Sequence, residues 1–199
     1  MTNIRISVFA LVLILCAAFK SHVTDIKPAV GDIAPEIILR NPDGKLIKLS
    51  DLRGKVVLID FWAGWCRTCR IENNTIRQAY DSYKDKSFDI GEGFTVYSVS
   101  LDTDPEAWQK AIVNDRLSWP NHGCEFKKWE SEIVKTYNFT YLPHNLLIDG
   151  KGKIIYNPPD ARPGPARTIS WRATSRTPPP MGVGGGSRNL SWAQSFGWV

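Results

Sequence analysis

One segment constrains the fold of this chain more than any other: VVLIDFW at 56–62, followed after three residues by CRTC at 66–69. The first part is a continuous run of strand-forming apolar residues, interrupted only by Asp60. Such a run is typical of a strand that is covered on both faces. The spacing of apolar residues after it, beginning at Ile71, predicts an amphipathic helix over 67–83. The two cysteines therefore lie where a buried strand turns into a helix.

Strands and helices alternate along the rest of the middle of the chain. A second apolar run predicts a strand, Asp104-Pro105-Glu106 predicts the start of a helix, and Asp149-Gly150-Lys151-Gly152 predicts a tight turn. We expect the segment 119–124 to be a loop. The predicted elements are a hairpin of strands 37–40 and 46–49, strand 56–62, helix 67–83, strand 94–101, helix 105–115, helix 130–137 and a closing hairpin of strands 145–148 and 153–156. This order predicts an α/β fold with a mixed sheet.

The N-terminus has the pattern of a targeting segment. Arg5 precedes a nearly unbroken apolar run at 6–19, and Lys20 closes it. Fourteen residues span about 21 Å as a helix, which is shorter than the ~30 Å hydrocarbon core of a membrane. We therefore expect 1–20 to be an export signal cleaved near Cys16, with an uncleaved membrane anchor or a lipid-modified Cys16 as alternatives. In either case the domain works outside the cytosol, after a polar connector at 21–30.

The C-terminal segment 157–199 differs from the body of the chain. It holds seven prolines, six glycines, no lysine, and five arginines against one acid, so it supplies +4 of the net charge of +5. The body at 31–156 is close to neutral, and no basic face predicts a nucleic-acid partner. We interpret 157–199 as the product of a shifted reading frame or a cloning scar. A disordered exported tail is the alternative.

Cysteine chemistry is the strongest functional signal. Apart from the N-terminal segment, the cysteines are Cys66, Cys69 and Cys124, too few for a framework of stapling disulfides. Cys66 would begin a helix, where unpaired N–H groups and the helix dipole favour the nucleophilic thiolate. Arg67 and Arg70 would add positive charge. Cys69, one turn deeper, is placed to attack a mixed disulfide formed at Cys66, which is the chemistry of thiol–disulfide exchange.

Other interpretations of these residues stay open. Cys66 and Cys69 could form a structural disulfide, or they could join His122 and Cys124 as four zinc ligands. For Cys124 we expect a partly buried free thiol rather than a second redox cysteine. For His144 we expect a surface or packing role.

Two longer motifs, LSDLRGKVVLIDFWAGWCRTCRIEN and LPHNLLIDGKGKII, resemble those of the thioredoxin-like thiol–disulfide oxidoreductases of bacterial envelopes, of the TlpA and ResA type. The resemblance covers about 31–156. It implies a thioredoxin-like fold with a mixed central sheet flanked by helices and an N-terminal β-hairpin. The last helix of that family has no visible counterpart in 157–199, so we expect it to be missing or replaced.

The resemblance also implies roles for residues around the cysteines. Cys66 corresponds to the attacking cysteine and Cys69 to the resolving cysteine. Pro143 corresponds to a cis-proline beside the pair, and the backbone of Leu142 would pair with the substrate peptide. Trp65 is a further expected substrate contact.

Two acids complete the expected site. Glu72 corresponds to an acid that tunes the thiols, and Asp60 occupies the position of a buried acid. A carboxyl in apolar surroundings has a raised pKa, so it can exchange a proton with Cys69 as that thiol attacks. The chain departs from the family pattern at Thr68 and Asn74, where prolines are usual; Thr68 is expected to shift the redox potential.

The resemblance implies an exported thiol–disulfide oxidoreductase, a reductase, in the periplasm or cell envelope. Its expected partners are disulfide-containing envelope proteins and a membrane thiol–disulfide electron donor, and no cofactor is expected. One alternative is a thiol peroxidase of peroxiredoxin type, although Ala63 stands three residues before Cys66, where a threonine is needed. The other is a metallochaperone or a binding module without enzymatic activity.

Overall fold

The computed structural model describes residues 27–158. The expected export signal or anchor at 1–20, most of the connector at 21–30 and all of the tail beyond Pro158 lie outside the described residues, and so does any terminal helix. Within the described part, no helix is long and apolar enough to cross a membrane.

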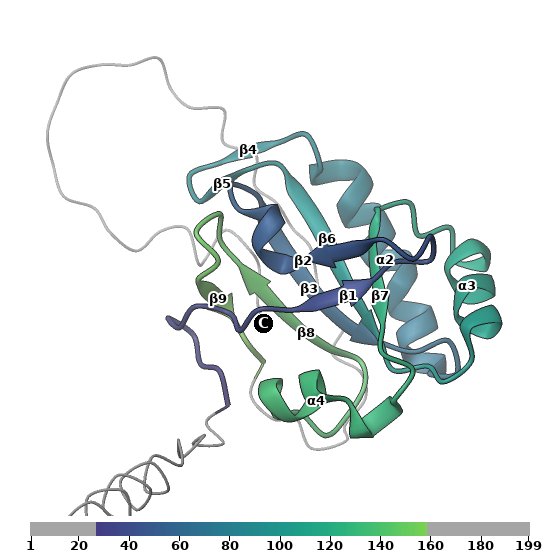
Figure 1. Ribbon diagram of the computed structural model, residues 1–199. Coiled ribbons are helices and arrows are strands. Elements are labelled where there is room, and N and C mark those ends of the chain that lie inside the picture. Colours follow the sequence, from purple (N-terminus) through teal and green to yellow (C-terminus); the bar gives the residue numbers. More distant parts are fainter. Residues whose placement is uncertain (1–26, 159–199) are drawn as a thin grey trace, which may run out of the picture.

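A five-stranded mixed sheet forms the centre of the domain, in the order β7-β6-β3-β8-β9 (Figure 1). The central strand β3 runs parallel to its neighbour β6 and antiparallel to its other neighbour, β8. The strands are β3 (Val56–Trp62), β6 (Phe94–Ser100), β7 (Asn121–Cys124), β8 (His144–Ile148) and β9 (Ile154–Tyr156). The mixed sheet and the thioredoxin-like order of its elements confirm the predicted fold class.

The two innermost parallel strands explain the apolar runs in the sequence. Every residue of β3 and of β6 is buried, and the strands pair in register from Val56 opposite Phe94 to Trp62 opposite Ser100. Side chains alternate between the two faces of a strand, so a strand covered on both faces is apolar at nearly every position. Asp60, the charged residue of these two strands, lies opposite Ser98, one of the hydroxyl-bearing residues of β6.

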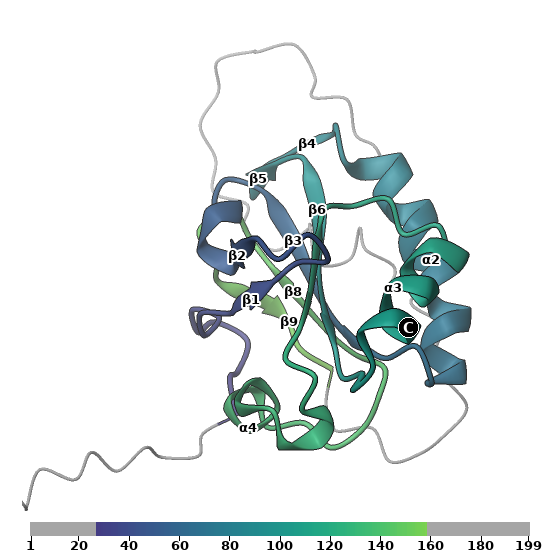
Figure 2. The same ribbon diagram turned by 45° about the vertical axis from the view of Figure 1, so that its right-hand side comes forward.

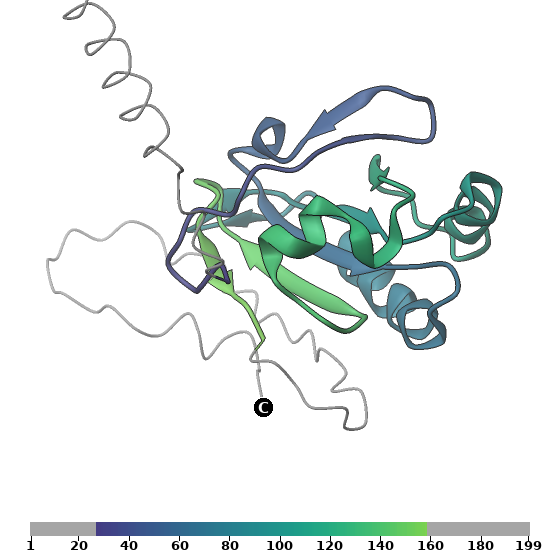
Figure 3. The same ribbon diagram turned by 60° about the horizontal axis from the view of Figure 1, so that its bottom comes forward.

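Helices and the N-terminal hairpin cover opposite faces of this sheet. Figure 2 shows α2 (Arg67–Tyr83) and α3 (Pro105–Asn114) on one side. The hairpin of β1 (Ile38–Arg40) and β2 (Leu46–Lys48) lies on the other side, as Figure 3 also shows. That side also carries the 3-10 helix η1 (Leu49–Leu52) and α4 (Glu132–Tyr137).

The long helix α2 has the predicted bounds, and its buried face agrees in part with the predicted one. Ile76 and Ala79 of the predicted row are buried, whereas Ile71 is 66% exposed. The buried row is completed by Cys69 and Asn73. The spacing of three or four residues is that of one helix face, shifted so that the second cysteine points into the core.

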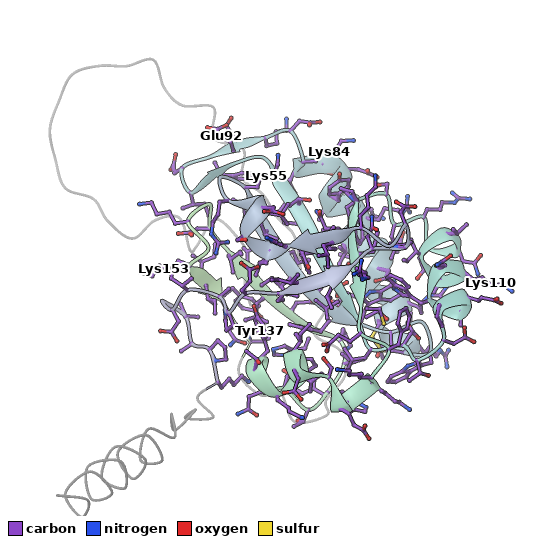
Figure 4. The ribbon with its side chains drawn as sticks, in the orientation of Figure 1. Lys55, Lys84, Glu92, Lys110, Tyr137 and Lys153 are labelled. Atoms are coloured by element: carbon purple, nitrogen blue, oxygen red, sulfur yellow. A yellow bond between two sulfur atoms is a disulfide. The ribbon has the colours of Figure 1, made fainter. Side chains whose placement is uncertain are left out.

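On the opposite face, Tyr137 fastens α4 to the segment before the hairpin. Its hydroxyl donates a hydrogen bond to the carbonyl of Pro35 over 2.6 Å, and its ring packs 5.2 Å from that of Phe61 on β3 (Figure 4). The short helix therefore packs directly against the strand that leads to the cysteines.

The expectation that 119–124 is a loop was wrong, because Asn121–Cys124 forms the edge strand β7, parallel to β6. This strand carries no strand-forming side chains, and it is in contact with the hairpin as well as with β6. A Cβ added at Gly123 would lie 2.5 Å from Cβ of Leu39, so glycine lets the hairpin lie against the strand. The predicted third helix begins later than expected, at Glu132, after the 3-10 helix η2 (Lys128–Glu130). A small ribbon of β4 (Ser87–Phe88) and β5 (Gly91–Glu92) was not predicted.

Candidate active site

The cysteine pair lies where β3 gives way to α2, as predicted. The structure holds Cys66 and Cys69 as a disulfide, with their Cα atoms 5.3 Å apart. Cys66 is the N-cap of α2, and its sulfur accepts a hydrogen bond from the backbone N–H of Cys69 over 3.2 Å. Cys66 is 7% exposed and Cys69 is 1% exposed. A partner can therefore reach Cys66 more readily than Cys69.

Thr68, which stands where the related proteins usually have proline, contacts the first cysteine. Its hydroxyl oxygen lies 3.4 Å from Sγ of Cys66. Proline has no side-chain donor at this place. The departure from the family pattern therefore adds a polar contact to the sulfur that is expected to react.

Pro143 and Leu142 lie at the same end of the sheet as the cysteines. The Leu142–Pro143 peptide bond is cis, as the resemblance implied. The next residue, His144, begins β8 directly opposite Phe61, one residue before the end of β3. Leu142 is half-buried, so part of it is open to a partner.

Trp65 is the large exposed side chain next to Cys66. Its side chain is 51% exposed, and Nζ of Lys128 lies 5.2 Å from the centre of its ring, within the range of a cation–π contact. A surface cavity of about 330 Å³ adjoins Trp65 between the cysteine loop and α3. Lys110 on α3, which projects outward in Figure 4, is one of its lining residues. The arrangement leaves an aromatic surface next to the first cysteine.

Asp60 is a buried acid, as predicted, and it lies on β3 beneath the cysteine helix. It is 1% exposed, and its Oδ2 accepts a hydrogen bond from the hydroxyl of Ser98 over 3.2 Å. Burial raises the pKa of Asp60 to about 8, and the nearby charge of Glu72 acts in the same direction, while the hydrogen bond from Ser98 opposes it. The carboxyl is therefore mostly protonated at neutral pH.

Glu72 is the second acid of the site, one helical turn after Cys69. Burial raises the pKa of Glu72 to about 7, and a hydrogen bond from Asn145 opposes this effect. Nδ2 of Asn145 donates to Oε1 of Glu72 over 3.0 Å. Because this pKa is near neutral, Glu72 can both accept and release a proton at physiological pH.

Asn145 was not predicted as a site residue. It lies on β8 directly opposite Asp60. The signal in the sequence was an amide inside the apolar strand HNLLI, where a polar side chain needs a buried partner.

Arg70 was expected to add positive charge near Cys66, and in the structure this charge is paired with a carboxylate. Nη2 of Arg70 donates to Oδ1 of Asp115 over 2.6 Å, its Nε bonds the other carboxylate oxygen, and its Nη1 donates to the carbonyl of Gly64 over 3.2 Å. Nδ2 of Asn73 also donates to Asp115, over 2.7 Å. We call these four residues the Asp115 clasp. The charge of Arg70 is paired within it, and the clasp ties the cysteine loop to the end of α3.

The loop before the cysteines is also fixed from β6. The backbone N–H of Gly64 donates to Oδ2 of Asp102 over 2.8 Å, and Asp102 in turn accepts a hydrogen bond from the hydroxyl of Ser100 over 2.7 Å. A Cβ added at Gly64 would lie 3.1 Å from Cβ of Ala111 on α3. Both neighbouring elements therefore hold the loop that presents Cys66.

Cys124 is a buried free thiol. Burial raises the pKa of Cys124 to about 11, and its sulfur donates a hydrogen bond to the carbonyl of Asp102 over 3.4 Å. A thiol with so high a pKa is a poor nucleophile at neutral pH. The interpretation of Cys124 as a free thiol rather than a second redox cysteine is therefore supported.

Neither His122 nor His144 takes part in a metal site within residues 27–158. His122 is buried, with Nε2 3.3 Å from the carbonyl of Leu117, and burial lowers the pKa of His122 to about 4. Across the described residues, no three histidine, cysteine or acidic side chains come together as metal ligands, so the alternative zinc set does not converge. His144 is 1% exposed and stacks on Phe139 with ring centres 5.0 Å apart, which is the packing role that was expected.

The fold and the site together define a thioredoxin-like protein with a two-cysteine centre. The model of the AhpC/TSA family matches residues 30–157, which is more than half of the chain. The chain therefore belongs to the AhpC/TSA family.

Curated relatives narrow this assignment. The chain is 32% identical over 153 residues to the thiol-disulfide oxidoreductase ResA of Bacillus thuringiensis. This alignment covers 73% of the present chain and 82% of that protein. It is 33% identical over 131 residues to ResA of Bacillus cereus, covering 65% of this chain and 69% of that protein. The resemblance to ResA-type thiol–disulfide oxidoreductases is thereby confirmed.

Solved structures agree with the sequence relatives. The thioredoxin domain of a thiol-disulfide oxidoreductase from Bacteroides vulgatus superposes with a TM-score of 0.59 at 35% identity, over 67% of this chain and 90% of that chain. The C-terminal domain of a putative thiol-disulfide oxidoreductase from Bacteroides thetaiotaomicron superposes with a TM-score of 0.60 at 32% identity. This match covers 69% of the present chain and 90% of that domain's chain. Both have the same kind of fold as the described residues.

Proposed function

We propose that the chain is an exported thiol–disulfide oxidoreductase that reduces disulfides of envelope proteins. The observation that carries this proposal is the Cys66–Cys69 disulfide at the start of α2, in which Cys66 is the more exposed partner. A pair that closes a disulfide within one helical turn can be oxidised and reduced without rearrangement of the fold. The kinship with ResA supports the same chemistry.

The reaction begins with the reduced pair. The thiolate of Cys66 attacks one sulfur of the client disulfide, the client S–S bond breaks, and the departing client thiolate takes a proton from solvent. A mixed disulfide now joins Cys66 to the client. The thiol of Cys69 loses its proton and attacks Sγ of Cys66, which releases the second client thiol and forms the Cys66–Cys69 disulfide. Two electrons have passed from the cysteine pair to the client.

The buried acids support the second step. Glu72, one turn from Cys69, takes the proton that Cys69 must lose, because the pKa of Glu72 at about 7 leaves much of it as carboxylate at neutral pH. Asp60, mostly protonated at this pH, lies beneath and exchanges the proton with Glu72. Asp60 is buried and Glu72 is half-buried, so the proton either passes to solvent from Glu72 or returns to Cys69 when the disulfide is reduced.

Client contacts surround the first cysteine. Trp65 offers an exposed aromatic surface, and the backbone of Leu142, before Pro143, pairs with the client peptide. Such backbone pairing tolerates many client sequences, because it depends on main-chain atoms.

Direction and location are parts of the same proposal. A membrane thiol–disulfide electron donor restores the reduced pair. The resemblance to the TlpA and ResA type implies a reductase, and the apolar run at 6–19 supports export to the periplasm or cell envelope. Fractionation of cells that produce the full chain tests the location.

The thiol peroxidase alternative has less support. That chemistry uses a peroxidatic cysteine with a threonine before it, whereas Ala63 stands three residues before Cys66 and Cys69 is bonded to Cys66. No specific observation favours a metallochaperone.

Trapping of the mixed disulfide tests the proposal. Cys69→Ser removes the resolving thiol, so the reduced variant should accumulate a covalent complex with a disulfide-containing protein, seen on non-reducing gels and lost with dithiothreitol. Cys66→Ser is the matched control and should trap nothing. Equal trapping by both variants, or by neither, would contradict the assigned roles.

A further inference from the structure

Asn145 is a buried amide that lies between the two acids of the site. It is 5% exposed, and its Cα is paired with that of Asp60 across β3 and β8. Because paired residues of neighbouring strands point to the same face of a sheet, both side chains face α2. Its Nδ2 reaches Glu72 on that helix over 3.0 Å.

The carboxyl groups of Asp60 and Glu72 accept hydrogen bonds from side chains on two different strands, β6 and β8. Asp60 accepts from Ser98 on β6, whose hydroxyl oxygen itself accepts from Nε1 of Trp119 over 2.9 Å. For Glu72, the amide of Asn145 is the one hydrogen-bond donor found within residues 27–158, and Oε2 of Glu72 is buried without a partner there. The orientation of the Glu72 carboxyl therefore depends on this amide.

We propose that Asn145 is a positioning residue for thiol exchange: its amide holds the Glu72 carboxylate one turn from Cys69, ready to take the proton of that thiol. This inference rests on the proposed function. In the step concerned, the S–H bond of Cys69 breaks, its proton passes to Glu72, and the resulting thiolate forms the bond to Cys66 as the client thiolate leaves.

The titratable groups around Glu72 make the effect of the amide predictable. Cys69 precedes it on α2, Asp60 faces it from β3, and β8 contributes only the neutral amide of Asn145. No lysine or arginine of the described chain acts on either carboxyl. The N–H donor favours the charged form of Glu72 and so opposes the rise in pKa that burial causes.

Asn145→Leu in the full chain tests the proposal, because it removes the donor and keeps the volume. The rate of reduction of oxidised glutathione is measured from pH 5.5 to 9, and the side-chain carboxyl of Glu72 is titrated by ¹³C NMR in the reduced protein. We expect the inflection of the pH–rate profile and the inflection of the Glu72 titration to move up by about one pH unit each. The rate then falls about tenfold at pH values below the inflection and stays near that of the wild type at high pH. Asn145→Ala, which removes the amide without adding a titratable group, serves as a second variant and should move both inflections in the same direction.

Asn73→Leu is the matched control. Asn73 is also a buried asparagine of the domain, and its Nδ2 donates to a carboxylate, that of Asp115, over 2.7 Å. The Asn73→Leu substitution should lower the melting temperature without moving the inflection of the pH–rate profile or that of the Glu72 titration. If the Asn145 variants behave like Asn73→Leu, the positioning role is wrong.

The two measurements separate this inference from the proposed function. If the wild-type chain reduces no disulfide at any pH, the proposed function fails and the positioning role fails with it. The NMR titration then still shows whether Asn145 controls Glu72. If exchange occurs and only the Glu72 titration fails to shift in the variants, the inference alone is overturned.

Discussion

Arg70 and Asp115, 45 residues apart in the sequence, form a bidentate ion pair between the first turn of α2 and the end of α3. The side chain of Asp115 is 14% exposed and that of Arg70 is 30% exposed. Because Arg70 also binds the carbonyl of Gly64, the pair fixes the loop that presents Cys66.

Loss of this pair should destabilise the fold. Asp115→Ala leaves Arg70 and the buried amide of Asn73 without their acceptor, and we expect the free energy of unfolding to fall by about 1–3 kcal/mol, measured by urea denaturation. The control is Glu132→Ala, which breaks the exposed pair of Glu132 with Lys135 and should leave stability unchanged. Equal effects of the two substitutions would show that the Asp115 clasp does not hold the site together.

Asp60 should make the protein less stable as the pH rises. The unfolded chain releases this proton near the ordinary pKa of 3.8, whereas the native protein keeps it until about 8. The unfolded state therefore binds fewer protons across this window, and the free energy of unfolding falls between about pH 4 and about pH 8. Asp60→Asn should remove most of that slope and stabilise the protein at pH 7 by about 2 kcal/mol or more.

Denaturation at several pH values measures this slope. Asp81→Asn, a substitution of an exposed aspartate on α2, is the control and should leave the slope as in the wild type. His122, whose pKa burial lowers to about 4, contributes a slope of the opposite sign in both proteins, so the comparison with Asp60→Asn decides. An Asp60→Asn variant with the same slope as the wild type from pH 5 to pH 8 would contradict the burial of a protonated Asp60.

Thr68 should raise the redox potential of the pair. A hydroxyl beside Cys66 can donate a hydrogen bond to its thiolate and so stabilise the reduced form. Removing a hydrogen bond worth about 1 kcal/mol should make the midpoint more negative by roughly 20 mV in Thr68→Val, measured against glutathione. Thr75→Val, further along α2, should leave the midpoint in place. An unchanged midpoint in Thr68→Val would show that the hydroxyl does not act on the sulfur.

Gly123 should be required by the hairpin that packs on β7. Gly123→Ala brings a Cβ within 2.5 Å of Cβ of Leu39, and we expect a loss of about 1–3 kcal/mol in the free energy of unfolding. Leu39→Ala alone should also destabilise, since Leu39 is buried. The double variant should lose less than the sum of the two, because Leu39→Ala removes Cδ1 and Cγ, which lie 2.6 Å and 3.1 Å from the added Cβ, although Cβ of residue 39 remains. Strict additivity would show that the two residues do not meet.

The parts of the fold that the sequence predicts well are those with a local signature. The run at 56–62 and the helix at 67–83 appear in the structure with the predicted bounds, and Asp104 caps α3 as expected, accepting from the backbone N–H of Glu106 over 2.9 Å. The cysteine pair, the cis bond before Pro143 and the burial of Asp60 were also predicted correctly.

The parts that were missed depend on contacts between distant segments. The strand at Asn121–Cys124 has no strand-forming residues of its own, and it pairs because β6 and the hairpin border it. The direction of Arg70 depends on Asp115, which helical spacing cannot reveal. Asn145 lies on a strand that periodicity does predict, but its partner Glu72 is 73 residues earlier, on another element.

A redox titration of the full chain tests the central claim most directly. After equilibration in glutathione or dithiothreitol buffers, thiols are trapped by alkylation, and mass spectrometry reads the state of each cysteine. We predict one reversible two-electron couple confined to Cys66 and Cys69, near the thioredoxin value of about −270 mV, with Cys124 remaining a thiol throughout. The absence of a reversible couple would contradict a working redox pair, and a midpoint near about −120 mV would contradict the assignment as a reductase.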